Sequence, residues 1–390
     1  MTFVVGHDGD TQREAENRPE TPTVHLGAYR ARDGSSGAGL HLDVDGPHAM
    51  LVVGKRGYGK SYTLGVLAEA LARTEGIAPV VVDPMGVFGG LAADDGGDPA
   101  GTEAPIRATV VEDPTVDPAA LDPRSWCAML DLDPTGAAGS LVWRAAQEGP
   151  ARDESAGLAA MREGVRTADA DPAARRAADN HLALAAGWGA FAKGGLDAAT
   201  LGTGAATVVD VSGLAAAPLN AVCRGIAEAL YRGRVSNELQ RLPWLLVDEA
   251  HALFAGVAAP ALERILTRGR APGVSLVLAT QRPSAVPAVG VSQADVLVAH
   301  RLTSEADLEA LARARPTYLE TSLEARLPTG TGEVVIVDDA TETVHAAAIR
   351  ERVTPHEGES PSLRERRARK DNREVGDEVS RPGRKSDKTH

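Results

Sequence analysis

The chain has 390 residues, of which 43% are hydrophobic, enough for one large α/β core with appendages or for two modest domains. Its net charge of -13 argues against a surface that binds nucleic acid over its whole extent, but leaves open a pore or groove lined locally with arginine. The two cysteines, Cys127 and Cys223, lack the spacing of a disulfide framework or a zinc site. The acidic, lysine-poor composition is typical of a halophilic cytoplasm or of a GC-rich genome.

The two ends of the chain differ from its body. Residues 1–21 carry few large apolar side chains and predict a disordered arm. Residues 351–390 are charged without apolar periodicity and predict a disordered tail, either a solubilising end or a weak contact to phosphate backbones. The N-terminus is not signal-like, and no apolar run approaches the ~18 residues that span a bilayer. We therefore expect a cytoplasmic protein with no membrane span.

Next along the chain, residues 22–48 contain two strand-like runs around a Gly/Ser turn and predict a short N-terminal β-hairpin. From residue 49 to 350, short β-branched runs alternate with helical stretches, which indicates an α/β fold with a mainly parallel sheet covered on both faces. Residues 136–190 are Ala-rich and strand-poor, so we predict a helical insertion there. The expected core strands are Met50 to Val53, Val80 to Asp83, Ala108 to Val111, Thr207 to Val211, Trp244 to Asp248, Val274 to Thr280, Val296 to His300 and Val334 to Val337. The expected core helices are Lys60 to Arg73, Leu219 to Leu239, Ala258 to Arg268 and Glu305 to Arg313.

A glycine-rich loop follows the first core strand and opens a helix, which is the context that a phosphate-binding P-loop requires. Glycines let backbone N–H groups turn toward phosphates, and the helix N-terminus adds its positive dipole end. Lys60 would reach the β- and γ-phosphate oxygens, and the hydroxyl of Ser61 would bind Mg²⁺. The predicted nucleotide-binding residues are Gly54, Lys55, Arg56, Gly57, Tyr58, Gly59, Lys60, Ser61 and Tyr62.

Paired carboxylates end the apolar strand that reaches Val247. Asp248 suits a hold on Mg²⁺, and Glu249 is placed to polarise an attacking water, so the order of the two acids favours hydrolysis. His251 completes the letters Asp-Glu-Ala-His. The other motifs of the helicases named for those letters are not evident, and a structural or weakly coupling role for His251 stays open.

Two further elements are candidates for sensing or completing the site. Gln281 ends the next strand, where an amide could sense the γ-phosphate; a strand-terminating turn is the alternative. Arginines precede that strand, and one could project onto the γ-phosphate of a neighbouring subunit, with Arg270 favoured over Arg268. Surface ion pairs or DNA-phosphate contacts are the other readings of these arginines.

Asp83 places a carboxylate and the Asp-Pro-Met-Gly turn after the second core strand. It could serve the nucleotide site or simply shape the turn. The spacing also fits a GTPase pattern, but no Asn-Lys-x-Asp guanine-reading motif occurs in the chain. The expected cofactors are therefore ATP and Mg²⁺.

Together, the P-loop after a short hairpin, the Asp-Pro-x-Gly turn, the Asp-Glu-Ala-His strand end and Ala-Thr-Gln-Arg-Pro-Ser resemble the HerA/FtsK group of P-loop ATPases, nearest its HerA-like (DUF87) branch. The resemblance covers about residues 22–352. It implies a RecA-like core, hexameric rings and translocation of double-stranded DNA, and in archaea a NurA nuclease partner. It assigns Lys60 and Ser61 to phosphate and Mg²⁺, and Asp248 with Glu249 to the Walker B pair. It assigns Gln281 as the sensor of the γ-phosphate. It assigns Arg270 as the trans finger, an arginine that reaches the γ-phosphate of a neighbouring subunit.

Two departures from the HerA pattern bear on these expectations. HerA proteins carry a full N-terminal β-barrel, whereas about 25 residues of strand-like sequence precede the P-loop here, as in a reduced barrel. The body of the chain is also acidic. The leading hypothesis is an ATP-driven DNA motor. The alternatives are an ATPase of the same fold that acts on protein or membrane machinery or as a regulatory switch, and a nucleotide-binding module with negligible turnover.

Overall fold

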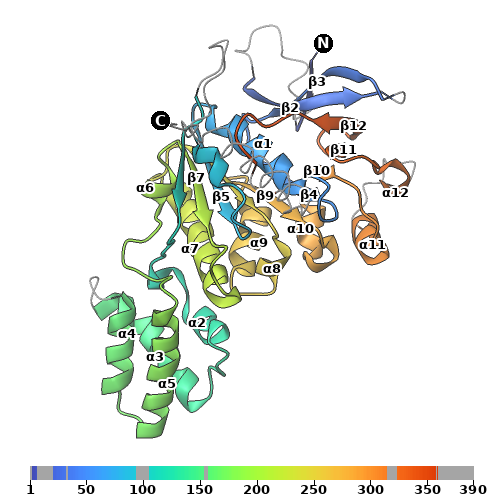
Figure 1. The fold of residues 1–390 in the computed structure, drawn as a ribbon. Coiled ribbons are helices and arrows are strands. Elements are labelled where there is room, and N and C mark those ends of the chain that lie inside the picture. Colours follow the sequence, from blue (N-terminus) through green and yellow to red (C-terminus); the bar gives the residue numbers. More distant parts are fainter. Residues whose placement is uncertain are drawn as a thin grey trace, which may run out of the picture. The chain divides into compact units, whose positions relative to one another are not determined.

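The computed structural model describes residues 2–6, 21–31, 34–93, 105–152, 157–313, 323–356 and 358. Its strands are β1 (Thr2–Val5), β2 (Thr23–Arg30), β3 (Ser36–Asp43), β4 (Ala49–Val53), β5 (Ile77–Asp83), β6 (Ala108–Val111), β7 (Ala206–Asp210), β8 (Leu242–Val247), β9 (Ser275–Thr280), β10 (Val296–Ala299), β11 (Glu333–Asp338) and β12 (Thr343–Ile349). They form one sheet in the order β1-β3-β2-β12-β11-β10-β4-β9-β8-β5-β7-β6 (Figure 1).

The α-helices are α1 (Lys60–Ala72), α2 (Pro123–Met129), α3 (Ala137–Arg152), α4 (Gly157–Thr167), α5 (Pro172–Gly187), α6 (Ala198–Leu201), α7 (Ala216–Val235), α8 (His251–Phe254), α9 (Ala259–Arg268), α10 (Ala288–Ser292), α11 (Glu305–Arg313) and α12 (Leu323–Arg326). The described residues also include the short 3₁₀ helices η2 (Gly89–Ala92), η3 (Pro118–Ala120) and η4 (Pro283–Ala285). Within the described ranges, no helix has the length and apolarity that crossing a bilayer demands.

The sheet has a parallel half, from β10 to β6, and a mixed half that carries the N-terminal strands. In the parallel half, alternate side chains of β4 enter two different cores: Leu51 packs with α7 and α9, whereas Met50 and Val52 pack with α1. Such alternation is expected when both faces of a sheet are covered. The predicted α/β class with a mainly parallel, doubly covered sheet is confirmed.

The predicted helical insertion is also confirmed, with α3, α4 and α5 spanning residues 137–187. These helices and α2 enclose their own core, which includes Trp126, Met161 and Leu182. Asp122 caps α2 by accepting a hydrogen bond from the Ser125 backbone N–H, at 2.8 Å, and it also pairs with Arg224 of α7 at 2.6 Å. The insertion is thus tied to the core through a buried guanidinium.

The N-terminal hairpin, β2 with β3, forms as predicted, but it is not a separate reduced barrel. It extends the core sheet, because β2 pairs antiparallel with β12, a strand that the sequence analysis did not anticipate. Gly27 permits the close approach: a Cβ atom there would lie 2.0 Å from the carbonyl oxygen of Ala348. The prediction of a disordered arm is wrong for Thr2–Val5, which form β1 and pair with β3. A four-residue strand gives too little periodicity to be found without its partner.

Other predicted bounds shift by small amounts. Helix α7 ends at Val235 rather than at Leu239, because Asn237 adopts a left-handed conformation (φ +59°) and the Leu239 N–H turns back to the carbonyl of Gly233. The prediction of a disordered tail over residues 351–390 is wrong for residues 351–356, because the backbone N–H groups of residues 352–354 donate hydrogen bonds to side chains of α1. Of the remaining tail, only residue 358 is among the described residues.

Candidate nucleotide-binding site

The carboxyl ends of the parallel strands bring the predicted site residues to one edge of the sheet. Val53 of β4 lies opposite Thr280 of β9 on one side and Ala299 of β10 on the other. The residues that follow these strands, Gly54, Gln281 and His300, are therefore level with one another. In β8 and β5, Val247 lies opposite Val82, so Asp248 and Asp83 reach the same edge.

The glycine loop needs its glycines for conformation and for space. Gly57 and Gly59 have φ values of +82° and +108°, a region that residues with a Cβ rarely adopt. A Cβ at Gly54 would lie 2.6 Å from the Cβ of His300. The loop then leads directly into α1, whose first residue is Lys60. The conformation is that of a phosphate-binding strand, loop and helix.

Lys60, Ser61 and Asp248 fit a nucleotide with Mg²⁺. Lys60 is only 5% exposed, and no carboxylate of the described residues lies within ion-pair distance of it. Burial lowers the pKa of its ammonium, whereas the charges of Glu249 and Asp248 raise it. The Ser61 hydroxyl donates to Asp248 Oδ2 at 2.6 Å, so both expected Mg²⁺ ligands already converge. A buried cation beside two converging oxygen ligands suits phosphate and a hard divalent ion.

Glu249 occupies a strained position next to Asp248. Its φ is +46°, and its N–H donates to Asp248 Oδ1 at 2.8 Å. Burial raises the pKa of the Glu249 carboxyl, and the charge of Asp248 adds to that rise, while Lys60 and Arg56 oppose it. Its Oε2 is buried and makes no hydrogen bond among the described residues. An unsatisfied carboxylate oxygen with a raised pKa is suited to accept a proton.

His251 lies between Glu249 and β9. Its Nδ1 is 3.3 Å from Glu249 Oε2, in a geometry that makes no hydrogen bond, and 3.3 Å from Thr280 Oγ1. Burial lowers the pKa of the imidazole, and the charges of Arg282 and Lys60 lower it further. His251 is therefore neutral near pH 7, and its contact with Glu249 is not an ion pair between opposite charges. The structure brings His251 to the site as a neighbour of Glu249, the predicted base.

Gln281 and the candidate arginines lie in three different settings. Gln281 is half-buried directly after β9, level with Gly54. Arg268 and Arg270 are exposed at and just beyond the end of α9. Arg264 is used within the chain, because its Nη1 donates to both carboxylate oxygens of the buried Glu228, at 2.9 and 2.8 Å. Arg268 and Arg270, which are both exposed, stay candidates for a role across a subunit interface.

Asp83 shapes its own turn. Its carboxylate accepts hydrogen bonds from the backbone N–H groups of Met85, at 3.1 Å, and Phe88, at 2.8 Å. Burial raises its pKa to about 6 despite these hydrogen bonds, and the nearby charge of Asp210 adds to the rise. Gly86 completes the turn with φ +65°. The observed contacts of Asp83 thus agree with the turn reading of the Asp-Pro-Met-Gly segment.

His300 belongs to the site but was missed by the sequence analysis. Its ring is fully buried against Gly54 and Gly59, and its Nε2 lies 3.0 Å from Thr63 Oγ1 in the first turn of α1. Burial, with a contribution from the charge of Lys60, lowers its pKa to about 4, so it is neutral. His300 follows β10 and belongs to none of the motifs that the sequence analysis identified. The only available signal was its place at the end of a predicted core strand.

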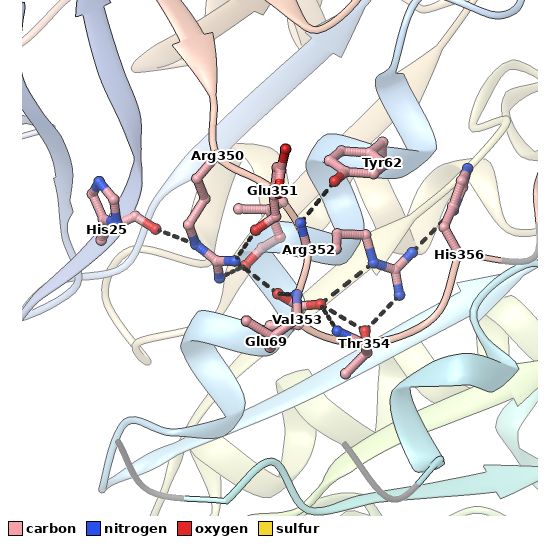
Figure 2. Close-up of polar contacts among 10 residues, drawn as sticks. His25, Tyr62, Glu69, Arg350, Glu351, Arg352, Val353, Thr354 and His356 are labelled. Atoms are coloured by element: carbon pink, nitrogen blue, oxygen red, sulfur yellow. Dashed lines mark hydrogen bonds and ion pairs between the residues drawn. The ribbon is translucent and has the colours of Figure 1, made fainter. Parts of the chain in front are cut away.

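A second group that sequence reasoning missed is the strap, residues 350–356, which follows β12 and contacts α1 (Figure 2). The backbone N–H of Arg352 donates to the hydroxyl of Tyr62 at 2.7 Å. Tyr62 was predicted from its place after Ser61 alone. The strap adds a contact that no local motif encodes.

Comparison with known families and structures agrees with this geometry. Residues 24–172 match the family described as the central domain of helicase HerA (DUF87). The structure of VirB4 from Thermoanaerobacter pseudethanolicus is similar with a TM-score of 0.64 and 17% identity, covering 86% of this chain and 98% of that one. No curated protein sequence matches the chain.

The plasmid coupling protein TrwB, solved in complex with ADP and Mg²⁺, is similar with a TM-score of 0.55 and 15% identity, covering 90% of this chain and 98% of that one. The unbound bacterial conjugative coupling protein TrwBΔN70 gives a TM-score of 0.55 at 14% identity, with 91% and 93% covered. At these identities the likeness concerns the fold. With the family match, it confirms the resemblance to P-loop ATPases of the HerA/FtsK type.

Proposed function

We propose that this chain, a P-loop protein of the HerA/FtsK type whose residues 24–172 match the HerA central domain, is an Mg²⁺-dependent ATPase. The observation that carries the proposal is the convergence of Ser61 and Asp248, at 2.6 Å, beside the buried Lys60 and the unsatisfied Glu249. A protein that only bound nucleotide would not need a carboxylate in that position.

Each residue has a role that follows from its contacts. The glycine loop and Lys60 bind the phosphates, and Ser61 with Asp248 would hold Mg²⁺, which neutralises charge on the phosphate oxygens. Glu249 takes the proton of the attacking water, because its buried Oε2 accepts no other hydrogen bond from the described residues. Gln281, level with the loop, is the proposed γ-phosphate sensor. The absence of a guanine-reading motif favours ATP.

The proposed use of hydrolysis is translocation on double-stranded DNA by a hexameric ring of subunits in the cytoplasm. The match to a helicase family supports DNA as the partner. The net charge of -13 means that any DNA contact must be local, in a pore or groove. A NurA-like nuclease is the corresponding partner, and co-purification of such a nuclease with the tagged chain would support it.

The DNA proposal is tested by measuring ATPase rates with and without duplex DNA across a salt series. The Glu249→Gln variant, measured in parallel, gives the background rate without the proposed base. We expect stimulation that weakens as salt rises, since phosphate contacts release counterions. If duplex DNA neither binds nor stimulates at any salt, the motor is excluded. ATP hydrolysis that persists without any DNA effect then favours the alternative, an ATPase acting on protein or membrane machinery or as a switch.

The proposed trans finger is tested by mixing subunits. Arg270→Ala subunits lack the finger, and Lys60→Ala subunits lack phosphate binding. If Arg270 acts across an interface, a mixture regains part of the activity, because some interfaces then combine an intact finger with an intact P-loop. The same mixing with Arg268→Ala identifies which arginine acts. Activity in no mixture, or a strict monomer with ATP and Mg²⁺, would exclude the finger.

A further inference from the structure

The carboxylate of Glu69, in the third turn of α1, is fully buried and belongs to no part of the proposed chemistry. Among the described residues, the hydrogen-bond partners of this carboxylate all come from the strap, as Figure 2 shows. Its Oε1 accepts from the Thr354 N–H at 2.9 Å, the Thr354 hydroxyl at 2.6 Å and Arg352 Nε at 3.4 Å. Its Oε2 accepts from Arg350 Nη1 at 2.9 Å and the Val353 N–H at 3.3 Å. Five directional contacts therefore fix the strap on one side chain of the P-loop helix.

The strap also contacts α1 closer to the nucleotide site. The Arg352 N–H donates to the Tyr62 hydroxyl, and the ring of His356 meets the Tyr62 ring edge-on at 5.4 Å. The Arg352 guanidinium packs against Gly65: a Cβ atom at Gly65 would lie only 2.6 Å from Arg352 Cζ. Positions 62, 65 and 69 follow one face of a helix, so the strap runs along α1 rather than crossing it at a point. Arg352 and His356 of the strap both contact Tyr62, the residue that follows Ser61.

The strap is anchored on its other side to the sheet and to the η2 turn. Arg350 donates through Nε to the carbonyl oxygen of His25 in β2, at 3.1 Å, and through Nη2 to the carbonyl of Val66 in α1, at 3.2 Å. The backbone of Pro355 lies against Gly90, where a Cβ would be 2.2 Å from the Pro355 oxygen. The strap thus links α1 to β2 and η2 at once.

We propose that the strap positions the P-loop helix for nucleotide, which makes Glu69, Arg352 and Thr354 positioning residues of the ATPase site. Apolar packing alone is non-directional and would leave α1 free to shift along its axis. Five hydrogen bonds to one buried carboxylate fix the helix in one register. The hydroxyl of Tyr62 carries that register to Ser61 and Lys60. This inference rests on the proposed ATPase function.

Glu69→Gln is the main test, because it keeps the side-chain volume but supplies one acceptor oxygen where five donors converge. Binding of a fluorescent ADP with Mg²⁺ is measured by titration at a temperature where circular dichroism shows the variant folded. We expect Kd to rise about tenfold or more, as for loss of charge-assisted hydrogen bonds. A variant that lacks residues 358–390 is the control: it keeps the strap and should bind nucleotide as the wild type does.

Two milder variants keep the test decisive if Glu69→Gln does not fold. Thr354→Val removes one hydroxyl donor, and Tyr62→Phe removes the hydroxyl that Arg352 contacts. Each should weaken ADP binding by about threefold, roughly one ordinary hydrogen bond. Folded variants that lose thermal stability but keep the wild-type Kd and kcat would overturn the positioning role. If the wild type itself fails to bind Mg²⁺ and ADP, the proposed function fails instead, so the two failures are distinguishable.

Discussion

In the third turn of α1, both oxygens of the buried Glu69 accept hydrogen bonds, whereas beyond the N-terminus of the same helix Glu249 keeps a buried Oε2 with none from the described residues. The chain thus satisfies the carboxylate of Glu69 and leaves that of Glu249 partly unsatisfied among the described residues.

The difference separates groups that hold the fold from groups that act. A buried polar atom without a partner costs free energy, so its persistence needs another explanation. At the candidate nucleotide site, the proposed ATPase function supplies that explanation, because ATP, Mg²⁺ and water would complete the hydrogen bonding. At Glu69, the chain supplies all partners itself. Other buried side-chain atoms without a hydrogen bond in the described residues, such as Trp244 Nε1 and Arg224 Nε, lie away from the glycine loop, so an unsatisfied atom marks a candidate reactive group only where it lies at the nucleotide site.

The largest effect should come from Glu249→Gln. The amide cannot take a proton from water, so we expect the hydrolysis rate to fall roughly 10²- to 10⁴-fold. Affinity for ATP should be kept, and thermal stability should not fall, since the variant removes a carboxylate whose charge is disfavoured by burial. Single-turnover hydrolysis and ADP titration check both parts. If Glu249→Gln hydrolyses ATP at the wild-type rate, Glu249 is not the base.

The pH dependence of stability should come next in size. The folded pKa of His300 is about 4, against an ordinary 6.5, so below pH 6.5 the unfolded chain binds a proton that the folded chain refuses. Its contribution to stability is full above pH 6.5 and is lost as pH falls toward 4, by roughly 3 kcal/mol. Urea unfolding of wild type and His300→Asn across this range checks the sign. Equal pH slopes for the two proteins would contradict it.

His300→Ala tests the same residue at a fixed pH. It leaves a cavity beneath the glycine loop and removes the partner of Thr63 Oγ1, so we expect about 2 kcal/mol lower unfolding free energy. ATP affinity should fall as well, because the loop loses the ring packed against Gly54 and Gly59. Unfolding and nucleotide titration are measured on one preparation at pH 8. Thr63→Val, which keeps the ring, is the matched control for the lost hydrogen bond.

The smallest effect should come from a second satisfied carboxylate, Glu228 in α7. Arg264→Ala removes two of its hydrogen bonds, and because the Arg264 side chain is 37% exposed we expect only about 1 kcal/mol of destabilisation. The ATPase rate should not change. Exposed Arg268→Ala is the control and should alter stability by less than about 0.5 kcal/mol. A large loss of rate in Arg264→Ala would break the distinction between satisfied and reactive groups.

Much of the site could be predicted from sequence, because each motif is contiguous and its chemistry depends on local backbone. The glycine loop opens a helix, and Asp248 and Glu249 end a strand, so short-range pattern places them. Gln281 reaches the same edge through strand order, which a parallel sheet makes predictable. For Asp83 the sequence left two readings open, and the contacts with Met85 and Phe88 agree with the turn reading.

What only the tertiary structure decided depends on pairs far apart in the chain. Strand β12 can pair with the N-terminal hairpin because Gly27 has no Cβ to clash with Ala348. Strand β1 is formed through its pairing with β3. His300 contacts Thr63, which is 237 residues away in the sequence, and Glu69 contacts Thr354, which is 285 residues away. Motifs report residues whose chemistry needs near neighbours. The hydrogen-bond partners of a buried polar group can come from any part of the chain. These partners can therefore be identified only from the folded structure.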